Sequence, residues 1–166
     1  MIIYLVIFLA VISRFLPHMP NFAPITALAI FSAANMDWKK SVGLTLAARF
    51  ISDLFLGFFS WPLMVAVYAA HLVGILFGLW IKHSEKYKAF KITISALASS
   101  VIFFLVTNFA FLYSSYAHTF SGINEAYING LPFFRGTLLG DLSYTVVMFG
   151  ALALAKQLSK TKQVYA

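Results

Sequence analysis

The chain has 166 residues, of which 61% are hydrophobic and only 10% are charged, and its mean hydropathy is +0.88. A soluble domain of this length needs more charged surface, so the composition indicates an integral membrane protein surrounded by lipid. The absence of cysteine excludes disulfides, thiolate metal sites and cysteine nucleophiles, and the net charge of +7 comes from lysines that flank apolar runs, a pattern that sets membrane topology and does not favour nucleic-acid binding.

Six apolar segments follow one another along the chain and predict an all-α, compact bundle of six transmembrane helices in a single domain, residues 1–166. The first segment has no basic leader and no small-x-small cleavage site, so we expect a mature helix and not a signal peptide. The first two segments are shorter than the roughly 20 residues that a crossing needs. We expect them to tilt less, to be extended by their connection, or to stop short inside the bundle. The approximate ranges of the six segments are 1–15, 22–36, 40–59, 62–81, 89–114 and 133–156.

The connection between the first two segments lies in the stretch "SRFLPHMPNFAPITALAIF", residues 13–31, which contains three prolines, a histidine and an asparagine. Proline fixes its own backbone φ and costs no hydrogen bond in the first turn of a helix. Asn21 is a suitable N-cap for the second helix. Two interpretations stay open: a pre-organised gate that presents His18, Asn21 and Phe22 to a cavity, or a stiff turn that returns the chain to the bilayer.

The lysines predict the orientation of the six crossings. All nine fall on one side, which the positive-inside rule makes cytoplasmic, together with both termini. The outer side then holds the proline-rich connection, a tight "GFFSWP" turn, and a longer segment, about residues 115–132. We expect this last segment either to lie flat on the bilayer as an amphipathic piece or to fold back over the bundle as a lid. The lysines are Lys39, Lys40, Lys82, Lys86, Lys88, Lys91, Lys156, Lys160 and Lys162.

Ionisable side chains are costly in hydrocarbon, so those inside the predicted helices are candidates for a binding site. Arg49 and Asp53 are four residues apart and can pair on one helix face. Asp141 has no basic partner on its own helix, and Arg49 is its best candidate, so we predict a cluster of Arg49, Asp53 and Asp141. This cluster is either a structural ion pair or a site whose partly free arginine suits an anionic or carbonyl-bearing ligand. The predicted ligand-binding residues are His18, Asn21, Phe22, Arg49, Asp53, His71, Asn108, Arg135 and Asp141.

Three pairs of small residues, each four positions apart, are expected to let helices approach closely in a membrane. Packing within the chain and docking of a partner helix leave the same pattern, so both interpretations stay open. The pairs are Ala29 with Ala33, Gly74 with Gly78, and Gly136 with Gly140.

The sequence contains no motif of an enzyme class that we tested. It lacks a His-Glu-x-x-His helix, a Gly-x-Ser-x-Gly elbow and a phosphate-binding glycine loop. A haem at His71 would need a second imidazole at matching depth, and the other histidines are expected nearer the surfaces. We therefore expect a protein that is not an enzyme and that holds no metal or cofactor.

Four strings, "PHMPNFAPITALAIF", "SDLFLG", "VIFFLVTNFAF" and "LPFFRGTLLGDL", resemble the signatures of a small family of uncharacterised bacterial membrane proteins, over a range from Arg14 to about Gly150. Six helices, a structured connection after the first and an acidic residue closing the third resemble the substrate-binding (S) components of energy-coupling factor (ECF) vitamin transporters. That resemblance implies the inner membrane of a bacterium, a cavity open to the outer half of the membrane, and a partner transmembrane subunit with ATPases. S components dock this partner through small residues of the first helix. That helix offers only Ala10 here, so Ala29 and Ala33 are the candidate substitute.

The resulting hypothesis is a membrane component that captures a small organic nutrient, similar to a vitamin or cofactor, from the outer side for uptake. Its alternative is a non-catalytic accessory or structural subunit of a larger membrane assembly, whose central polar cluster would be satisfied internally. A third class is a proton-linked channel or transporter that acts alone. The aromatic residues expected on the outer side favour a flat, ring-bearing ligand; they are Phe58, Phe59, Trp61, Tyr113, Tyr116, Phe133 and Phe134.

Overall fold

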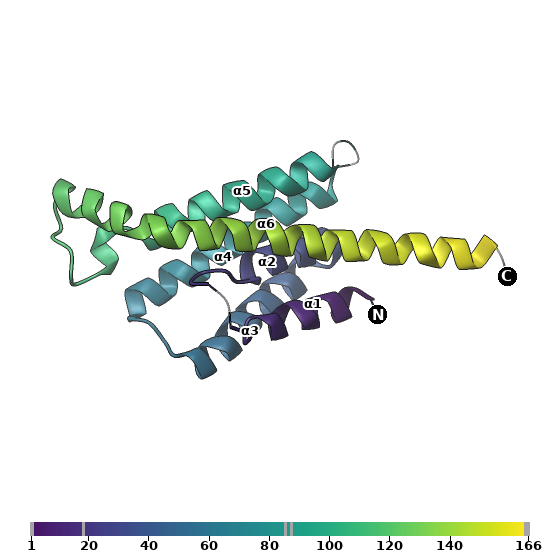
Figure 1. The fold of residues 1–166 in the computed structure, drawn as a ribbon, viewed down its shortest axis with the longest axis horizontal. Helices are drawn as coiled ribbons and strands as arrows, with labels where there is room; N and C mark the ends of the chain where they lie inside the picture. The colour runs from purple at the N-terminus through teal and green to yellow at the C-terminus, as the bar shows by residue number, and fades with distance from the viewer. Residues whose placement is uncertain (1, 18, 85, 87, 165–166) are drawn as a thin grey trace.

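The computed structural model describes residues 2–17, 19–84, 86 and 88–164, and within these residues it contains six α-helices and a short 3-10 helix (Figure 1). Each of the six predicted segments overlaps one α-helix, so the prediction of an all-α fold is confirmed. The elements are α1 (Ile2–Ser13), α2 (Ile25–Asn35), α3 (Trp38–Leu56), α4 (Trp61–Lys82), α5 (Lys88–Thr107), the 3-10 helix η1 (Ala110–Leu112) and α6 (Phe120–Val164).

Three of these helices, α4, α5 and α6, are long and apolar enough to cross a membrane, which indicates a membrane protein. By contrast, α1 has 12 residues and α2 has 11. At 1.5 Å per residue they are about 18 and about 17 Å long, little more than half of the roughly 30 Å hydrocarbon core. Both helices stop short inside the bundle, and α4, α5 and α6 continue past them (Figure 1).

The central helix is α2, which contacts all five other α-helices. Its residues from Ile25 to Ala33 are all buried. Small residues explain its close approach to α4: a Cβ added at Gly74 would lie 3.0 Å from the Cβ of Ala29, and one at Gly78 would lie 2.7 Å from the Cβ of Ala33. Since all four positions are buried, the pairs pack α2 against α4 within the chain. The suggestion that Ala29 and Ala33 form a docking surface is wrong.

Residues 14–24 connect α1 to α2, and we call them the proline segment. The segment packs against α6 through the third pair of small residues. A Cβ added at Gly136 would collide with the carbonyl oxygen of Pro20, and one at Gly140 would lie 3.0 Å from the backbone nitrogen of Ala23. All three predicted pairs therefore serve packing within the chain.

The backbone of the proline segment differs from the prediction at its end. The second helix begins at Ile25 and not near residue 22, and its N-cap is Pro24, without a side-chain capping hydrogen bond. The prediction that Asn21 caps this helix is therefore wrong. Asn21 instead has a φ of 61°, in the left-handed region that asparagine tolerates better than most residues. It lets the chain turn sharply before the helix starts.

The last helix, α6, begins earlier than predicted and is unusually long. Its 45 residues run through Pro132, and at 1.5 Å per residue they span about 67 Å, more than twice the hydrocarbon thickness. We predicted a helix from residue 133, preceded by a separate surface piece or lid. The structure instead joins most of that piece to the helix. Proline tolerates such a position only where neighbouring groups compensate for the lost backbone hydrogen bond.

The first turns of α6 pack over the end of α5. The hydroxyl of Tyr127 donates a hydrogen bond to the carbonyl of Leu105 at 2.8 Å, and the rings of Phe104 and Tyr127 have centroids 5.7 Å apart. Asn108 lies against Gly130, where an added Cβ would collide with its side-chain oxygen. These contacts fix α6 and the α5–α6 connection beside each other at one end of the bundle.

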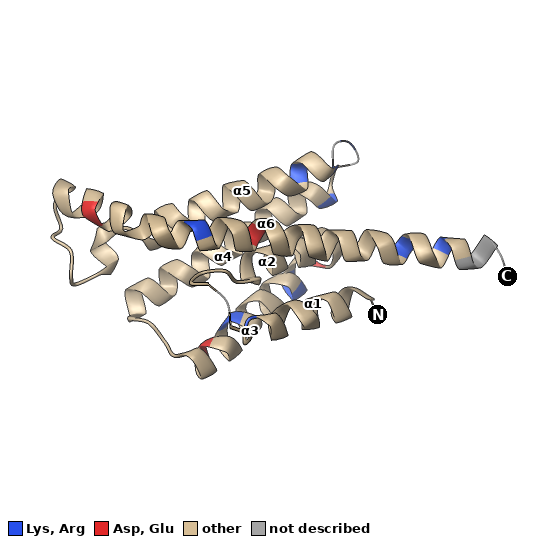
Figure 2. Ribbon diagram, in the orientation of Figure 1, with Lys and Arg blue, Asp and Glu red and all other residues tan. Residues whose placement is uncertain are grey.

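The opposite end of the bundle carries both ends of the chain and the α4–α5 connection (Figure 1). The described lysines lie at the start of α3, the end of α4, the α4–α5 connection, the start of α5 and the last turns of α6, and Lys and Arg, both blue in Figure 2, are frequent at this end. Lys82 Nζ donates to the carbonyl of Met36 at 2.6 Å, which joins the end of α4 to the α2–α3 connection. Whether α1 and α2 form a re-entrant pair or cross the membrane twice, the chain returns to the side on which it started. The predicted placement of the lysines on one side holds in both cases. The cytoplasmic location of this end stays a prediction.

Candidate functional site

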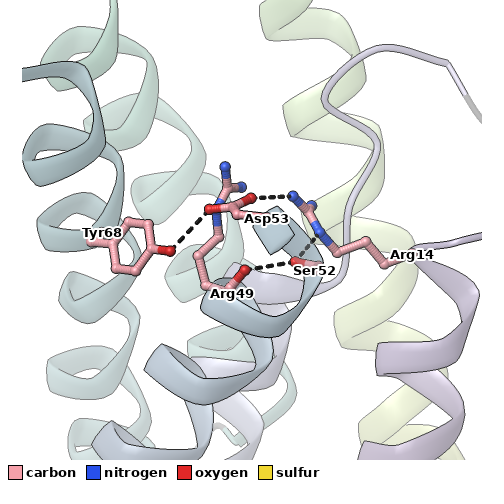
Figure 3. Close-up of polar contacts among 5 residues, drawn as sticks. All are labelled: Arg14, Arg49, Ser52, Asp53 and Tyr68. Atoms are coloured by element: carbon pink, nitrogen blue, oxygen red, sulfur yellow. Dashed lines mark hydrogen bonds and ion pairs between the residues drawn. The ribbon is translucent and has the colours of Figure 1, made fainter. Parts of the chain in front are cut away.

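Asp53 of α3 is the centre of a buried polar cluster (Figure 3). Its Oδ2 accepts hydrogen bonds from Arg49 Nε at 2.8 Å and from the Tyr68 hydroxyl of α4 at 3.0 Å. A terminal nitrogen of Arg14 lies 3.5 Å from its Oδ1. Asp53 is only 1% exposed, so these three donors replace the water that a carboxylate needs. The pairing of Arg49 with Asp53 predicted from their spacing is confirmed.

Arg14 brings the end of α1 into this cluster. Its Nε donates to the hydroxyl of Ser52 at 2.7 Å, and Ser52 donates in turn to the carbonyl of Arg49 at 2.8 Å (Figure 3). Arg14 is 8% exposed. The residue that directly follows α1 is thus held against α3, at the depth where α1 ends.

The cluster holds two guanidinium groups for one carboxylate, so it carries one positive charge in excess. Arg49 donates to Asp53 through Nε, and no hydrogen bond from its two terminal nitrogens is found among the described residues. The same guanidinium lies over the rings of Phe59 and Tyr68, with its central carbon 5.4 and 5.9 Å from their centroids. These cation–π contacts stabilise the charge but leave its in-plane N–H groups available to hydrogen-bond acceptors.

A cavity of about 340 Å³, which we call the outer cavity, lies on one side of Arg49. Its volume is in the range of small-molecule pockets. Its wall combines aromatic rings with amides and hydroxyls, and its residues come from α3, α4, α5, α6 and the connections between helices. Besides Arg49 and Asn21, the lining includes Phe59, Leu63, Val67, Phe103, Thr107, Asn108, Tyr113, Ser115, Tyr116, Ala126, Asn129, Gly130 and Phe133.

A second cavity of about 140 Å³, the inner cavity, adjoins the first, because Asn21, Arg49, Phe59 and Phe103 line both. The inner cavity is the more strongly charged of the two. Arg14, His71 and Asp141 contribute to its wall, with Ala23, Thr26, Leu56 and Thr137. Arg49 therefore lies at the junction, where a ligand in the outer cavity can reach the polar interior.

Four helices contribute a chain of polar groups beside the inner cavity. His71 Nδ1 of α4 lies 3.2 Å from the Thr26 hydroxyl of α2. The Thr26 side chain also interacts with the carboxylate of Asp141 on α6, which accepts a hydrogen bond from Ser100 of α5 at 2.7 Å. Among the described residues, His71 Nε2 is buried without a hydrogen-bond partner. Since such a group normally finds a partner, its position in the cavity wall suits a polar atom of a ligand or of water.

The family model of a family of unknown function, DUF6580, matches residues 1–164. The chain belongs to the DUF6580 family. Comparisons with curated proteins and with solved structures find no match. The match agrees with the predicted resemblance to an uncharacterised family, whereas the likeness to S components stays a prediction.

In this DUF6580 chain, five of the predicted ligand-binding residues line the two cavities. Asn21 and Arg49 line both, Asn108 lines the outer cavity, and His71 and Asp141 line the inner one.

Of the other predicted residues that the structure describes, three line neither cavity. Asp53 is buried beneath Arg49 as its counter-ion. Phe22 packs on Tyr144, with ring centroids 5.3 Å apart. Arg135 is exposed on α6. His18 lies outside the described residues.

The predicted pairing of Asp141 with Arg49 is wrong. Arg49 forms its ion pair with Asp53, and the carboxylate of Asp141 instead accepts its hydrogen bond from an uncharged group, Ser100. The two residues are nevertheless brought to the wall of one cavity. The three residues of the predicted cluster therefore do not form one hydrogen-bonded network. Arg49 and Asp141 line the inner cavity, and Asp53 is the counter-ion of Arg49.

Sequence reasoning missed several residues that build the site. Arg14 carried the signal that identified Arg49, an ionisable side chain next to an apolar run, and could have been found. The other four are Ser52, Tyr68, Thr26 and Ser100. Hydroxyl side chains are frequent in membrane helices, so nothing in the sequence distinguishes these. Among the described residues, no group of three or more His, Cys, Asp or Glu side chains could hold a metal ion.

Proposed function

We propose that this chain is the substrate-binding component of a membrane uptake system and that it captures a small organic nutrient in the outer cavity. The observation that carries the proposal is the cavity of about 340 Å³ whose inner boundary is formed by the partly unpaired guanidinium of Arg49. A purely structural ion pair needs no cavity beside it. Packed side chains would shield Arg49 better than an open space does.

The arrangement of the bundle supports capture from the outer side. The outer cavity lies among the α3–α4 connection, the α5–α6 connection and the first turns of α6. These segments lie at the end of the bundle opposite to the lysine-rich end (Figure 2). If the lysine-rich end is cytoplasmic, as the positive-inside rule predicts, the cavity belongs to the outer half of a bacterial inner membrane.

Uptake by such a component needs a partner transmembrane subunit and ATPases. The small residues offered as a docking surface are buried between α2 and α4, so a partner would contact other parts of the lipid-facing surface. The outward face of α1 is apolar, with Tyr4, Leu5, Phe8 and Leu9 all exposed. This face provides contact area without small-residue pairs.

The test is mass spectrometry of small molecules that co-purify with the full chain, compared between wild type, Arg49→Gln and Arg135→Gln. Arg135 is the matched control, because it is an exposed arginine that lines neither cavity among the described residues. A compound retained by wild type and Arg135→Gln and lost from Arg49→Gln would support the proposal.

Because Arg49→Gln also weakens the ion pair with Asp53, a second variant removes a lining group without touching the cluster. Asn129→Ala serves this purpose, since Asn129 is exposed and hydrogen-bonds only Tyr116 in the described part of the chain. The proposal fails if no compound co-purifies and a panel of vitamins and cofactors leaves the melting temperature of wild type unchanged. That result would favour the alternative function, an accessory subunit.

A further inference from the structure

The donors available at the junction of the two cavities define what Arg49 can bind. The Nε of Arg49 donates to Asp53, its two terminal nitrogens have no hydrogen bond among the described residues, and the side chain lines both cavities. The guanidinium is planar, and its terminal nitrogens present N–H groups in a fixed fork that fits the two oxygens of a carboxylate. The Arg49 side chain is only 7% exposed, so an anion bound there meets little competing water.

The local charge limits how negative that ligand can be. Arg14, Arg49 and Asp53 together leave one positive charge in excess, which one carboxylate balances. A phosphate monoester carries roughly two negative charges at neutral pH and would exceed that balance. Asp141 does not add a positive charge to this site, since it lines the same inner cavity and is hydrogen-bonded to Ser100.

The sizes of the two cavities also limit where the anionic group lies. The inner cavity holds about 140 Å³ and the outer one about 340 Å³, so the ring fits the outer cavity and the anionic group meets Arg49 at the junction. At the junction the anionic group contacts Arg49 and Asn21. The rings of Phe59 and Phe103 complete the wall that the two cavities share. The rest of the ligand must then extend into the larger, outer cavity.

The wall of the outer cavity suits a flat ring with polar edges. Phe59, Phe103 and Phe133 provide apolar ring faces. The amide nitrogen of Asn108 donates to the carbonyl of Phe104 at 2.9 Å, which leaves its amide oxygen to accept a hydrogen bond. Asn129 adds a second amide at the outer edge of the cavity.

From these contacts we infer that the nutrient is a small monocarboxylate with a flat, partly polar ring, held by its carboxylate on Arg49 at the junction and by its ring in the outer cavity. This inference rests on the proposed function and specifies its substrate class.

Matched pairs of carboxylate and carboxamide test the inference on the wild-type chain, purified at full length in lipid nanodiscs. Suitable pairs are benzoate with benzamide, nicotinate with nicotinamide, and 4-aminobenzoate with 4-aminobenzamide, because each pair has one shape and differs in charge. Equilibrium dissociation constants are measured by titration and supported by shifts in melting temperature. We expect at least one carboxylate to bind ten or more times more tightly than its amide.

Three variants then assign that preference to a residue. In Arg49→Gln the carboxylate preference should fall at least tenfold, equivalent to about 1.4 kcal/mol. Arg49→Lys keeps the charge beside Asp53 and loses only the fork, so it should fold and retain part of the preference. Arg135→Gln is the control and should bind as wild type does.

The outcomes separate the two proposals. If an amide or a cationic analogue binds as tightly as the carboxylate, or if Arg49→Gln keeps the preference, the inferred substrate class is overturned and capture of a small nutrient survives. If no member of the panel binds and nothing co-purifies with wild type, both fail.

Discussion

The substitution Gly136→Ala tests whether α6 holds the proline segment in position. A Cβ at this residue would collide with the carbonyl oxygen of Pro20, which is backbone and cannot rotate away. Alanine in a helix is otherwise favoured over glycine by about 0.5–1 kcal/mol. Gly150→Ala is the matched control, because Gly150 is on the same helix and an added Cβ meets nothing within 4 Å.

The gain in helix propensity is the same in both variants, so the difference between their melting temperatures measures the cost of the collision with Pro20. Overpacking of this kind costs about 1–3 kcal/mol, which corresponds to a difference of about 2–12 °C in melting temperature for a chain of this size. Thermal unfolding of both variants in the same detergent measures it. Gly136→Ala should melt below wild type and Gly150→Ala at or above it. Equal melting temperatures for the two variants would refute the packing of Pro20 against α6.

Three further predictions address charge, backbone and topology. Asp53→Asn removes the carboxylate that pairs with the buried guanidiniums of Arg14 and Arg49 and should lower the free energy of unfolding by about 3–5 kcal/mol. Glu125→Gln at an exposed position should change it by about 0.5 kcal/mol or less, and equal effects in chemical unfolding would contradict the cluster. Asn21→Gly should unfold near wild type, but Asn21→Val should lose about 1–2 kcal/mol because its φ is positive, and a Val variant as stable as the Gly variant would show that this φ is not required. The chain has no cysteine, so single variants report cleanly on topology: in intact bacterial cells a membrane-impermeant maleimide should label Thr119→Cys directly and Lys160→Cys only after permeabilisation, and the reverse order would invert the proposed orientation.

The number of helices and their closest contacts could be predicted from the sequence. Long apolar runs separated by polar residues predict helices, because the apolar side chains of each run must face either lipid or other helices. Small residues at four-residue spacing mark where backbones approach, and Gly74, Gly78, Gly136 and Gly140 all do so. These are local signals, carried by residues within one or two helical turns.

The partners of the charged residues depend on information that a linear sequence does not contain. Arg49 and Asp53 were paired correctly because both lie on one helix, whereas Arg14 reaches Asp53 from the connection that follows α1. Which residue of another helix meets Asp141 depends on the rotation of the helices about their axes, and the partner is Ser100 of α5 and not Arg49 of α3. A shift of one residue along a helix turns a side chain by about 100°, so depth alone cannot select the partner.

The two short helices and the cavities are consequences of one arrangement. The described residues between α1 and α2 are non-helical, and Arg14 and Pro24 at the two ends of this segment are buried. At membrane depth such backbone is tolerated only against protein or a polar cavity. The outer cavity lies beyond the helical ends of α1 and α2, since neither helix lines it, whereas Asn21 of the proline segment and Arg49 do. The charge excess of the Asp53 cluster depends on the same feature, since Arg14 reaches Asp53 only because α1 stops beside it. Extending α1 by two helical turns should therefore remove Arg14 from Asp53 and fill the cavity at once, so stability and ligand binding should be lost together and not separately.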